Sequence, residues 1–237
     1  MNMKKTIISG LICLLPVSAF AILGLGISGN ASQFIVDPSV SPLLVDNPLG
    51  GDPLEVGSFT HHGFENGGGV GFYLYVDAIP FIGLEAEVSS IISPYYFSFG
   101  NAITSIDSAV FGFLAGSAYY TAYAKVFKLS IPILAKVQLT AGAGINQHSS
   151  IPMINQEMLE AVVAGGDIED GALDEDVLIE YLTDNKIDAS GIHIQAGLQF
   201  KILVLDCIAL ARYTIVEDLI PGQKGFPSLN LRIGLGF

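Results

Sequence analysis

Apolar and polar side chains alternate with a period of two along much of the chain, most clearly in its C-terminal segment. A period of two places successive side chains on opposite faces of a β-strand. One face of this strand therefore meets an apolar environment and the other meets a polar one. The apolar positions are Leu229, Leu231, Ile233, Leu235 and Phe237, and the positions between them are Asn230, Arg232, Gly234 and Gly236.

The same alternation recurs along the chain and predicts eight strands. A half-buried strand of a soluble β-sandwich has this pattern too, but its repetition in strand after strand favours a barrel. Two segments, 108–126 and 206–217, are less regular and are assigned by their length and short connections. The predicted strands are 22–36, 66–77, 81–93, 108–126, 130–147, 190–203, 206–217 and 227–237.

Short and long connections alternate between these strands. This asymmetry is typical of bacterial barrels, whose short turns lie in the periplasm and whose long loops lie outside the cell. An even number of strands places both termini on the periplasmic side. The predicted short turns are 77–80, 127–129 and 204–205, and the predicted long loops are 37–65, 94–107, 148–189 and 218–226.

The composition supports a membrane barrel over the two other classes considered. The chain is 51% hydrophobic and 14% charged, yet beyond its N-terminus it has no apolar run of about 18 residues, which a transmembrane helix requires. A soluble globule rarely combines so few charges with 27 glycines and 9 tyrosines. Barrel strands spread their hydrophobicity in alternation, which accounts for both facts.

The N-terminus has the pattern of a secretion signal. Lys4 and Lys5 precede an apolar stretch, and residues 19–21 form an A-x-A cleavage site. We therefore expect a signal peptide over 1–21 and a barrel over 22–237. Cys13 follows Ile12 rather than a small residue, which argues against a lipoprotein signal. Cleavage would leave Cys207 as the single cysteine, so no intramolecular disulfide can form.

The charge of the expected mature chain is strongly acidic. Loss of two lysines with the signal leaves 8 basic and 23 acidic residues, a formal −15. A surface of this sign repels nucleic acid and other polyanions. We therefore expect no nucleic-acid partner.

With this architecture, the sequence resembles the superfamily of eight-stranded outer-membrane barrels, of the outer-membrane protein A, X and W type. The resemblance covers about residues 22–237, and its most specific part is the last strand, SLNLRIGLGF, which ends on Phe237. It implies an all-β, eight-stranded antiparallel transmembrane barrel in the bacterial outer membrane, in contact with its lipid. It also implies that the barrel assembly machinery reads the C-terminal strand, with Phe237 as its signal. No motif selects a subfamily, and a fold alone does not give a function.

The polar faces of the predicted strands carry the first candidate site. An eight-stranded barrel has an interior just wide enough for side chains to fill, and charges buried there must be paired. The favoured interpretation is a structural network that plugs the interior, and the alternative is a gated solute path. The candidate residues are Glu85, Glu87, Lys136, Gln138, His193, Gln199, Lys201, Arg212 and Arg232.

The histidines are weaker candidates. Some outer-membrane barrels are lipid hydrolases that use His with Ser and an acid, and His148 precedes Ser149 and Ser150. No strong motif supports that arrangement, so we expect no enzyme. His61 and His62 are adjacent and would point apart, which argues against a metal site.

The third long loop, about 148–189, is the most distinctive segment. Apolar residues at helical spacing predict two helices around 158–163 and 177–182, with Asp174 as the N-cap of the second. Gly165, Gly166 and Gly171 would separate them. The favoured interpretation is a solvated lid whose apolar faces pack on the barrel rim or on each other, and the alternative is a binding surface for divalent cations or a basic partner. Its acidic residues are Glu157, Glu160, Asp167, Glu169, Asp170, Asp174, Glu175, Asp176, Glu180, Asp184 and Asp188.

These features predict a non-enzymatic barrel with a filled interior and a structural or surface-interaction role, without a cofactor or a resident metal. The alternative is a narrow channel or carrier for small solutes, including apolar ones. Conductance in a planar bilayer distinguishes the two.

Overall fold

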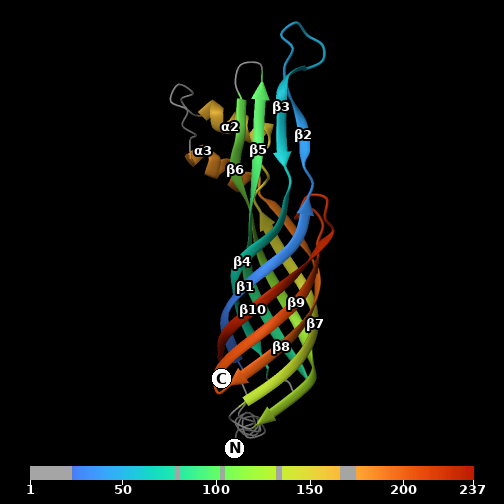
Figure 1. The fold of residues 1–237 in the computed structure, drawn as a ribbon, viewed down its shortest axis with the longest axis vertical. Coiled ribbons are helices and arrows are strands. Elements are labelled where there is room, and N and C mark those ends of the chain that lie inside the picture. Colours follow the sequence, from blue (N-terminus) through green and yellow to red (C-terminus); the bar gives the residue numbers. More distant parts are fainter. Residues whose placement is uncertain (1–22, 78–80, 102–104, 132–134, 166–174) are drawn as a thin grey trace, which may run out of the picture.

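Eight antiparallel strands of the computed structural model close into a barrel (Figure 1). The structure describes residues 23–77, 81–101, 105–131, 135–165 and 175–237. Around the ring the order is β5-β4-β1-β10-β9-β8-β7-β6, and β6 pairs with β5 to close it. The eight predicted strands are thereby confirmed as a ring. They are β1 (Leu23–Val36), β4 (Phe64–Val76), β5 (Ile82–Asn101), β6 (Ser105–Ile131), β7 (Ala135–Ser150), β8 (Ile187–Ile202), β9 (Leu205–Ile215) and β10 (Gly225–Gly236).

The first and last strands of the ring are paired along most of their length. Their register runs from Gly24 opposite Gly236 to Ser32 opposite Ser228. The backbone N–H of Phe237 donates to the carbonyl of Leu23 across 2.8 Å. Closure pairs the backbone groups that an open sheet would leave exposed, which a strand needs in order to lie in lipid.

The alternation along each strand separates an apolar outer face from a polar interior. Leu231 and Phe72 point outward and are each 70% exposed, whereas Arg232 is 1% exposed. The predicted facing of the C-terminal strand is therefore confirmed. A closed barrel with this outer face is built to span a membrane.

Two inward glycines make room for tyrosines of neighbouring strands. A Cβ atom on Gly24 would lie 2.2 Å from the ring of Tyr75, and one on Gly83 would lie 2.1 Å from the ring of Tyr123. Both distances are far below van der Waals contact, so each tyrosine packs over the bare backbone of its neighbour. The high glycine content thus helps large rings to fill a narrow interior.

Two of the predicted long loops are largely strand, and those two predictions were wrong. Residues 37–65 contain the hairpin of β2 (Ser39–Val45) and β3 (Leu54–His62), and β3 pairs with the upper part of β5. β5 and β6 also continue beyond the ring, as far as Gly100 opposite Ser105. A four-stranded sheet, β2-β3-β5-β6, therefore rises above the barrel (Figure 1). Apolar residues such as Val40 and Leu44 are exposed here, so the pattern of apolar and polar residues does not predict these strands.

The predicted turn at 127–129 was also wrong, because β6 continues to Ile131 and Leu129 pairs with Val137. A bulge between Lys125 and Phe127 shifts the register. Val126 and Phe127 are both exposed at this bulge, so the alternation is interrupted there and resumes with Leu129 and Ile131. The turn predicted at 204–205 agrees with the structure within one residue, since β8 ends at Ile202 and β9 begins at Leu205.

The acidic loop forms the two predicted helices, α2 (Gln156–Gly165) and α3 (Glu175–Asp184). The proposed N-cap Asp174 and the glycines at 166 and 171 lie outside the described residues, as does the expected signal peptide 1–21. Among the described residues, no helix is long and apolar enough to cross a membrane.

An apolar cluster sits where the barrel, the upper sheet and the helices meet. Phe34, Phe64, Phe113 and Phe226 lie at its centre, with ring centroids 5.7–6.2 Å apart in the contacting pairs. The segment before α2 joins this cluster, because the N–H of Ile154 donates to the hydroxyl of Tyr95 across 2.8 Å. The favoured interpretation of the loop, a lid on the rim, agrees with this packing. The lid side chains against the cluster are Met153, Met158, Leu159, Leu178, Tyr181 and Leu182.

Candidate functional site

The interior of the barrel is crossed by a compact group of four charged side chains. Arg232 on β10 places Nη1 2.7 Å from Oε2 of Glu85 and also donates to Glu87. Arg212 on β9 donates to Glu87 across 2.6 Å. Two arginines and two glutamates balance in charge, and all four side chains are at most 6% exposed. We call these four residues the charge network.

Polar neighbours donate further hydrogen bonds to both carboxylates of the charge network. The hydroxyl of Ser28 donates to Glu87 across 3.0 Å, and the amide of Gln195 donates to Glu85 across 3.1 Å. The guanidinium of Arg212 lies 3.8 Å from the ring centroid of Tyr119. Buried charges are tolerated when they are paired and hydrogen-bonded, and each of the four side chains is both. Among the described residues, only the Nε of Arg232 in this network lacks a hydrogen-bond partner.

A second polar layer lies nearer the chain termini. Tyr75 donates to Asp206, and the amide of Gln199 donates to the same carboxylate across 2.8 Å. Lys201 lies opposite Asp206 in the β8–β9 register. Sequence reasoning named Gln199 and Lys201 but missed Asp206 and Tyr75. An isolated carboxylate beside a turn carries no periodic signal, although the inward position of Tyr75 was readable from the alternation.

Lys136 belongs to this layer but not to the charge network. Its Nζ lies 3.1 Å from Oδ2 of Asp77, which also pairs with Lys125. Gln138 is fully buried and lines an interior cavity of about 20 Å³, and neither of its amide atoms has a hydrogen-bond partner among the described residues. A space of this size holds about one water molecule. This cavity is too small for a solute.

A hydrogen-bonded Ser–His–Asn series lies on the inner wall, nearer the apolar cluster. Ser117 Oγ is 2.8 Å from Nδ1 of His148, and Nε2 of His148 is 3.0 Å from Oδ1 of Asn146. His193 makes a similar bond to Thr121, at 2.8 Å. Serine hydrolases use such a series, but their serine must be reached by substrate. Here Ser117 and His148 are each 4% exposed and face the filled interior, so the arrangement is structural.

The adjacent histidines of β3 point to opposite faces, as expected. His61 is 2% exposed, and its ring centroid lies 4.5 Å from that of Tyr95. His62 is exposed and its Nε2 lies 3.0 Å from the hydroxyl of Ser98. In the part of the chain that the structure describes, no group of three or more His, Cys, Asp or Glu residues is placed to hold a metal ion.

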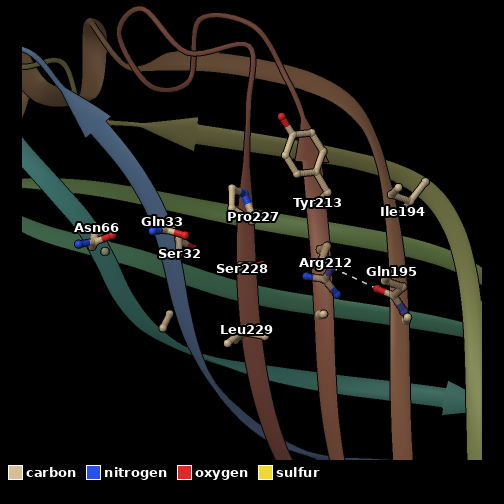
Figure 2. Close-up of a pocket in the computed structure, with 14 residues that line it drawn as sticks. Ser32, Gln33, Asn66, Ile194, Gln195, Arg212, Tyr213, Pro227, Ser228 and Leu229 are labelled. Carbon is tan, nitrogen blue, oxygen red and sulfur yellow. Dashed lines mark hydrogen bonds between the residues drawn. The ribbon is translucent and has the colours of Figure 1, made fainter.

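The outer wall carries a groove of about 570 Å³ across β4, β1, β10, β9 and β8 (Figure 2). Small outward residues, Ala31, Ala196 and Ala211, line it together with Ile194 and Leu229. The β1–β10 ladder ends at Ser32 opposite Ser228, although β10 stays paired with β9 as far as Gly225. The groove therefore lies where the first and last strands separate.

In the described part of the acidic loop, Lys186 forms an ion pair with Asp188 at 3.3 Å, and both side chains are more than half exposed. Acidic residues 167, 169, 170 and 174 lie outside the described residues. The expected cation or basic partner of this loop stays a prediction.

The geometry of the ring decides the fold class, because the barrel is closed, apolar outside and filled with polar groups inside. The chain has the fold of an eight-stranded outer-membrane β-barrel. No protein-family model matches the sequence, and no curated protein matches it. The chain is similar to solved structures of small barrels. Neisserial surface protein A (NspA) matches with 13% identity over 91% of this chain and 96% of that one, with a TM-score of 0.41.

Two further solved structures are similar at the same level. OprG, an outer membrane protein of Pseudomonas aeruginosa, matches with 9% identity over 92% of this chain and 94% of that one, with a TM-score of 0.42. Ail, the attachment invasion locus protein of Yersinia pestis, was solved with the heparin analogue sucrose octasulfate. It matches with 12% identity over 90% of this chain and 97% of that one, with a TM-score of 0.35.

Proposed function

We propose that this protein is a non-enzymatic, non-conducting barrel of the bacterial outer membrane that displays its upper sheet and lid at the cell surface. The single observation that carries the proposal is the charge network. Arg212, Arg232, Glu85 and Glu87 join β9 and β10 to β5 across the interior. An ion would have to break these bonds in order to pass.

The upper part of the molecule supports the surface role. The strands β2, β3, β5 and β6 and the two helices share one apolar cluster, so the displayed part is ordered rather than a set of loose loops. Ordered extracellular segments on a rigid barrel are a common way to present binding residues. The acidic helices favour a divalent cation or a basic partner by charge alone.

Conductance tests the closed interior. The purified barrel, reconstituted into a planar bilayer, should give no steady current. A conducting porin inserted by the same procedure is the control. Steady steps of current from the wild-type protein would contradict the proposal.

The groove favours a second candidate, a carrier for apolar solutes. It opens toward the lipid where β1 and β10 separate, and its lining is mostly apolar. A solute that left the barrel there would need no water-filled pore. Uptake of an apolar dye into proteoliposomes without any current would favour this candidate. Equal uptake by protein-free liposomes would exclude it.

A further inference from the structure

The extracellular part of the molecule holds a cavity of about 920 Å³ between the β2–β3 hairpin and the segment that leads into α2. The side chain of Gln156 ties the two walls together. Its Nε2 donates to the carbonyl of Leu44 across 2.9 Å, and its Oε1 accepts from the N–H of Leu44 across 3.3 Å. Small-molecule sites have volumes of roughly 300–1,000 Å³, so this cavity is large enough for one.

His61 lines this cavity and has no hydrogen-bond partner in the described structure. Both of its ring nitrogens are buried, and the residue is 2% exposed. Its pKa is lowered by burial and by the neighbouring His62, so the ring is neutral and offers one N–H donor and one acceptor nitrogen. A buried polar group without a partner is rare in proteins, and a ligand is one way to satisfy it.

An apolar surface lies beside this imidazole. Phe59 and Ile154 line the same cavity and are 5% and 8% exposed. Phe59 stacks on Phe97 with ring centroids 5.6 Å apart, which holds its ring in place. A flat apolar ligand body would find a fixed aromatic wall here.

The charge of the lining is acidic. Asp46 and Glu157 contribute carboxylates from opposite walls, and no Lys or Arg is among the lining residues. Both residues are exposed, so they attract a cation at the mouth without burying its charge.

We propose that this cavity binds a small amphipathic amine whose aromatic body lies against Phe59 and Ile154. Its ammonium group faces Asp46 and Glu157, and a hydroxyl at its other end bonds to His61. The site goes beyond the proposed display role and needs only the upper sheet and lid. Binding to the folded protein in detergent micelles therefore tests it independently of conductance, and a conducting barrel with an intact amine site would contradict the display proposal alone.

Tyramine is the probe, because it carries all three features. Two analogues each change one of them. Phenethylamine lacks the hydroxyl, and 4-hydroxyphenylacetate replaces the ammonium by a carboxylate. Calorimetric titration of the full-length folded protein should show tyramine binding about tenfold more tightly than phenethylamine, which is the effect of one hydrogen bond to a buried group. The carboxylate analogue should not bind.

Variants locate the contacts. His61→Phe keeps the aromatic packing and should lose the preference for tyramine over phenethylamine, whereas His62→Phe, on the opposite face, should retain it. Asp46→Asn changes an exposed group and should weaken both amines without affecting folding. The proposal is overturned if no probe binds, if 4-hydroxyphenylacetate binds as well as tyramine, or if His61→Phe, folded by gel shift, keeps the tenfold preference.

Discussion

Arg232 and Glu85 are 147 positions apart in sequence, yet the guanidinium of the last strand donates two hydrogen bonds to that carboxylate, at 2.7 and 3.0 Å. Their strands, β10 and β5, are not neighbours in the ring, because β1 and β4 lie between them. The bond therefore spans the interior rather than a strand pair. This ion pair therefore occupies the interior of the barrel.

Removing one member of the charge network should destabilise the barrel strongly. Glu87→Ala deprives Arg212 of its bond at 2.6 Å and leaves that guanidinium buried. Breaking a buried ion pair from one side costs about 3–5 kcal/mol. Urea unfolding in micelles, followed by gel shift, measures the change. Asp188→Ala removes an exposed ion pair and is the control, and it should leave the unfolding midpoint nearly unchanged.

Filling the space beside Tyr123 should also be costly. Gly83→Ala would place a methyl group 2.1 Å from the Tyr123 ring, so the ring must move within a filled interior. Overpacking of this kind typically costs about 1–3 kcal/mol. Gly29→Ala is the matched control, because a Cβ at that position meets nothing within 4 Å. Equal loss of stability in both variants would show that the tyrosine contact is unimportant.

The alternation of apolar and polar side chains predicted the strands of the ring and which side chains point inward or outward. It did not predict the sheet above the ring. Within the membrane, Leu231 and Arg232 face media of opposite polarity, so adjacent residues differ sharply in type. Above the ring, six of the seven residues of β2 are exposed, Val40 and Leu44 among them, and only Leu43 of this strand is buried. The hairpin therefore has no readable period, and its residues were assigned to a loop.

The sequence predicted which residues form the charge network, but it did not predict which of them pair with each other. The inward positions of Glu85, Glu87 and Arg232 follow from alternation. Arg212 lies on a less regular segment, which was assigned as a strand by its length and short connections. Which carboxylate meets which guanidinium depends on the shear of the barrel, and a single sequence does not specify it. Both ring nitrogens of His61 lack a hydrogen-bond partner among the described residues, and its ring packs against Tyr95 and Phe64. This environment is a feature of the tertiary structure, which a single sequence does not specify.

Phe237 should matter more for assembly than for the stability of the folded barrel. Its side chain is 63% exposed, while its backbone N–H supplies the bond to Leu23 whatever the side chain is. We expect Phe237→Ser to slow the appearance of folded barrel in cells and to change the urea midpoint of the purified protein only slightly. Unchanged assembly in a pulse-chase experiment would refute the role of this residue as an assembly signal.

The upper sheet should loosen in acid because of His61. Burial lowers the pKa of His61 below its ordinary value of 6.5, so the folded hairpin favours the neutral ring. The stabilisation is complete above about pH 6.5 and is lost as the pH falls toward the lower pKa of the folded state. Asp46 and Glu157 line the same cavity and oppose this effect, since their charges favour a protonated ring.

Nuclear magnetic resonance in micelles at about pH 7.5 and about pH 5 checks this prediction, because these values bracket the ordinary histidine pKa. Amide signals of β2 and β3 should weaken or shift at the lower pH, while those of β8 and β9 should not. In His61→Phe the weakening of the β2 and β3 signals should disappear, whereas in His62→Phe it should remain. Persistence of the acid effect in that variant would assign it to another group.

The closed interior is the central claim, and single-channel recording in a planar bilayer tests it most directly. The network of Arg212, Arg232, Glu85 and Glu87 predicts that wild-type protein, shown to be folded and inserted by gel shift and protease protection, carries no steady current. Reproducible ohmic steps from the wild-type barrel, absent from protein-free bilayers, would contradict it.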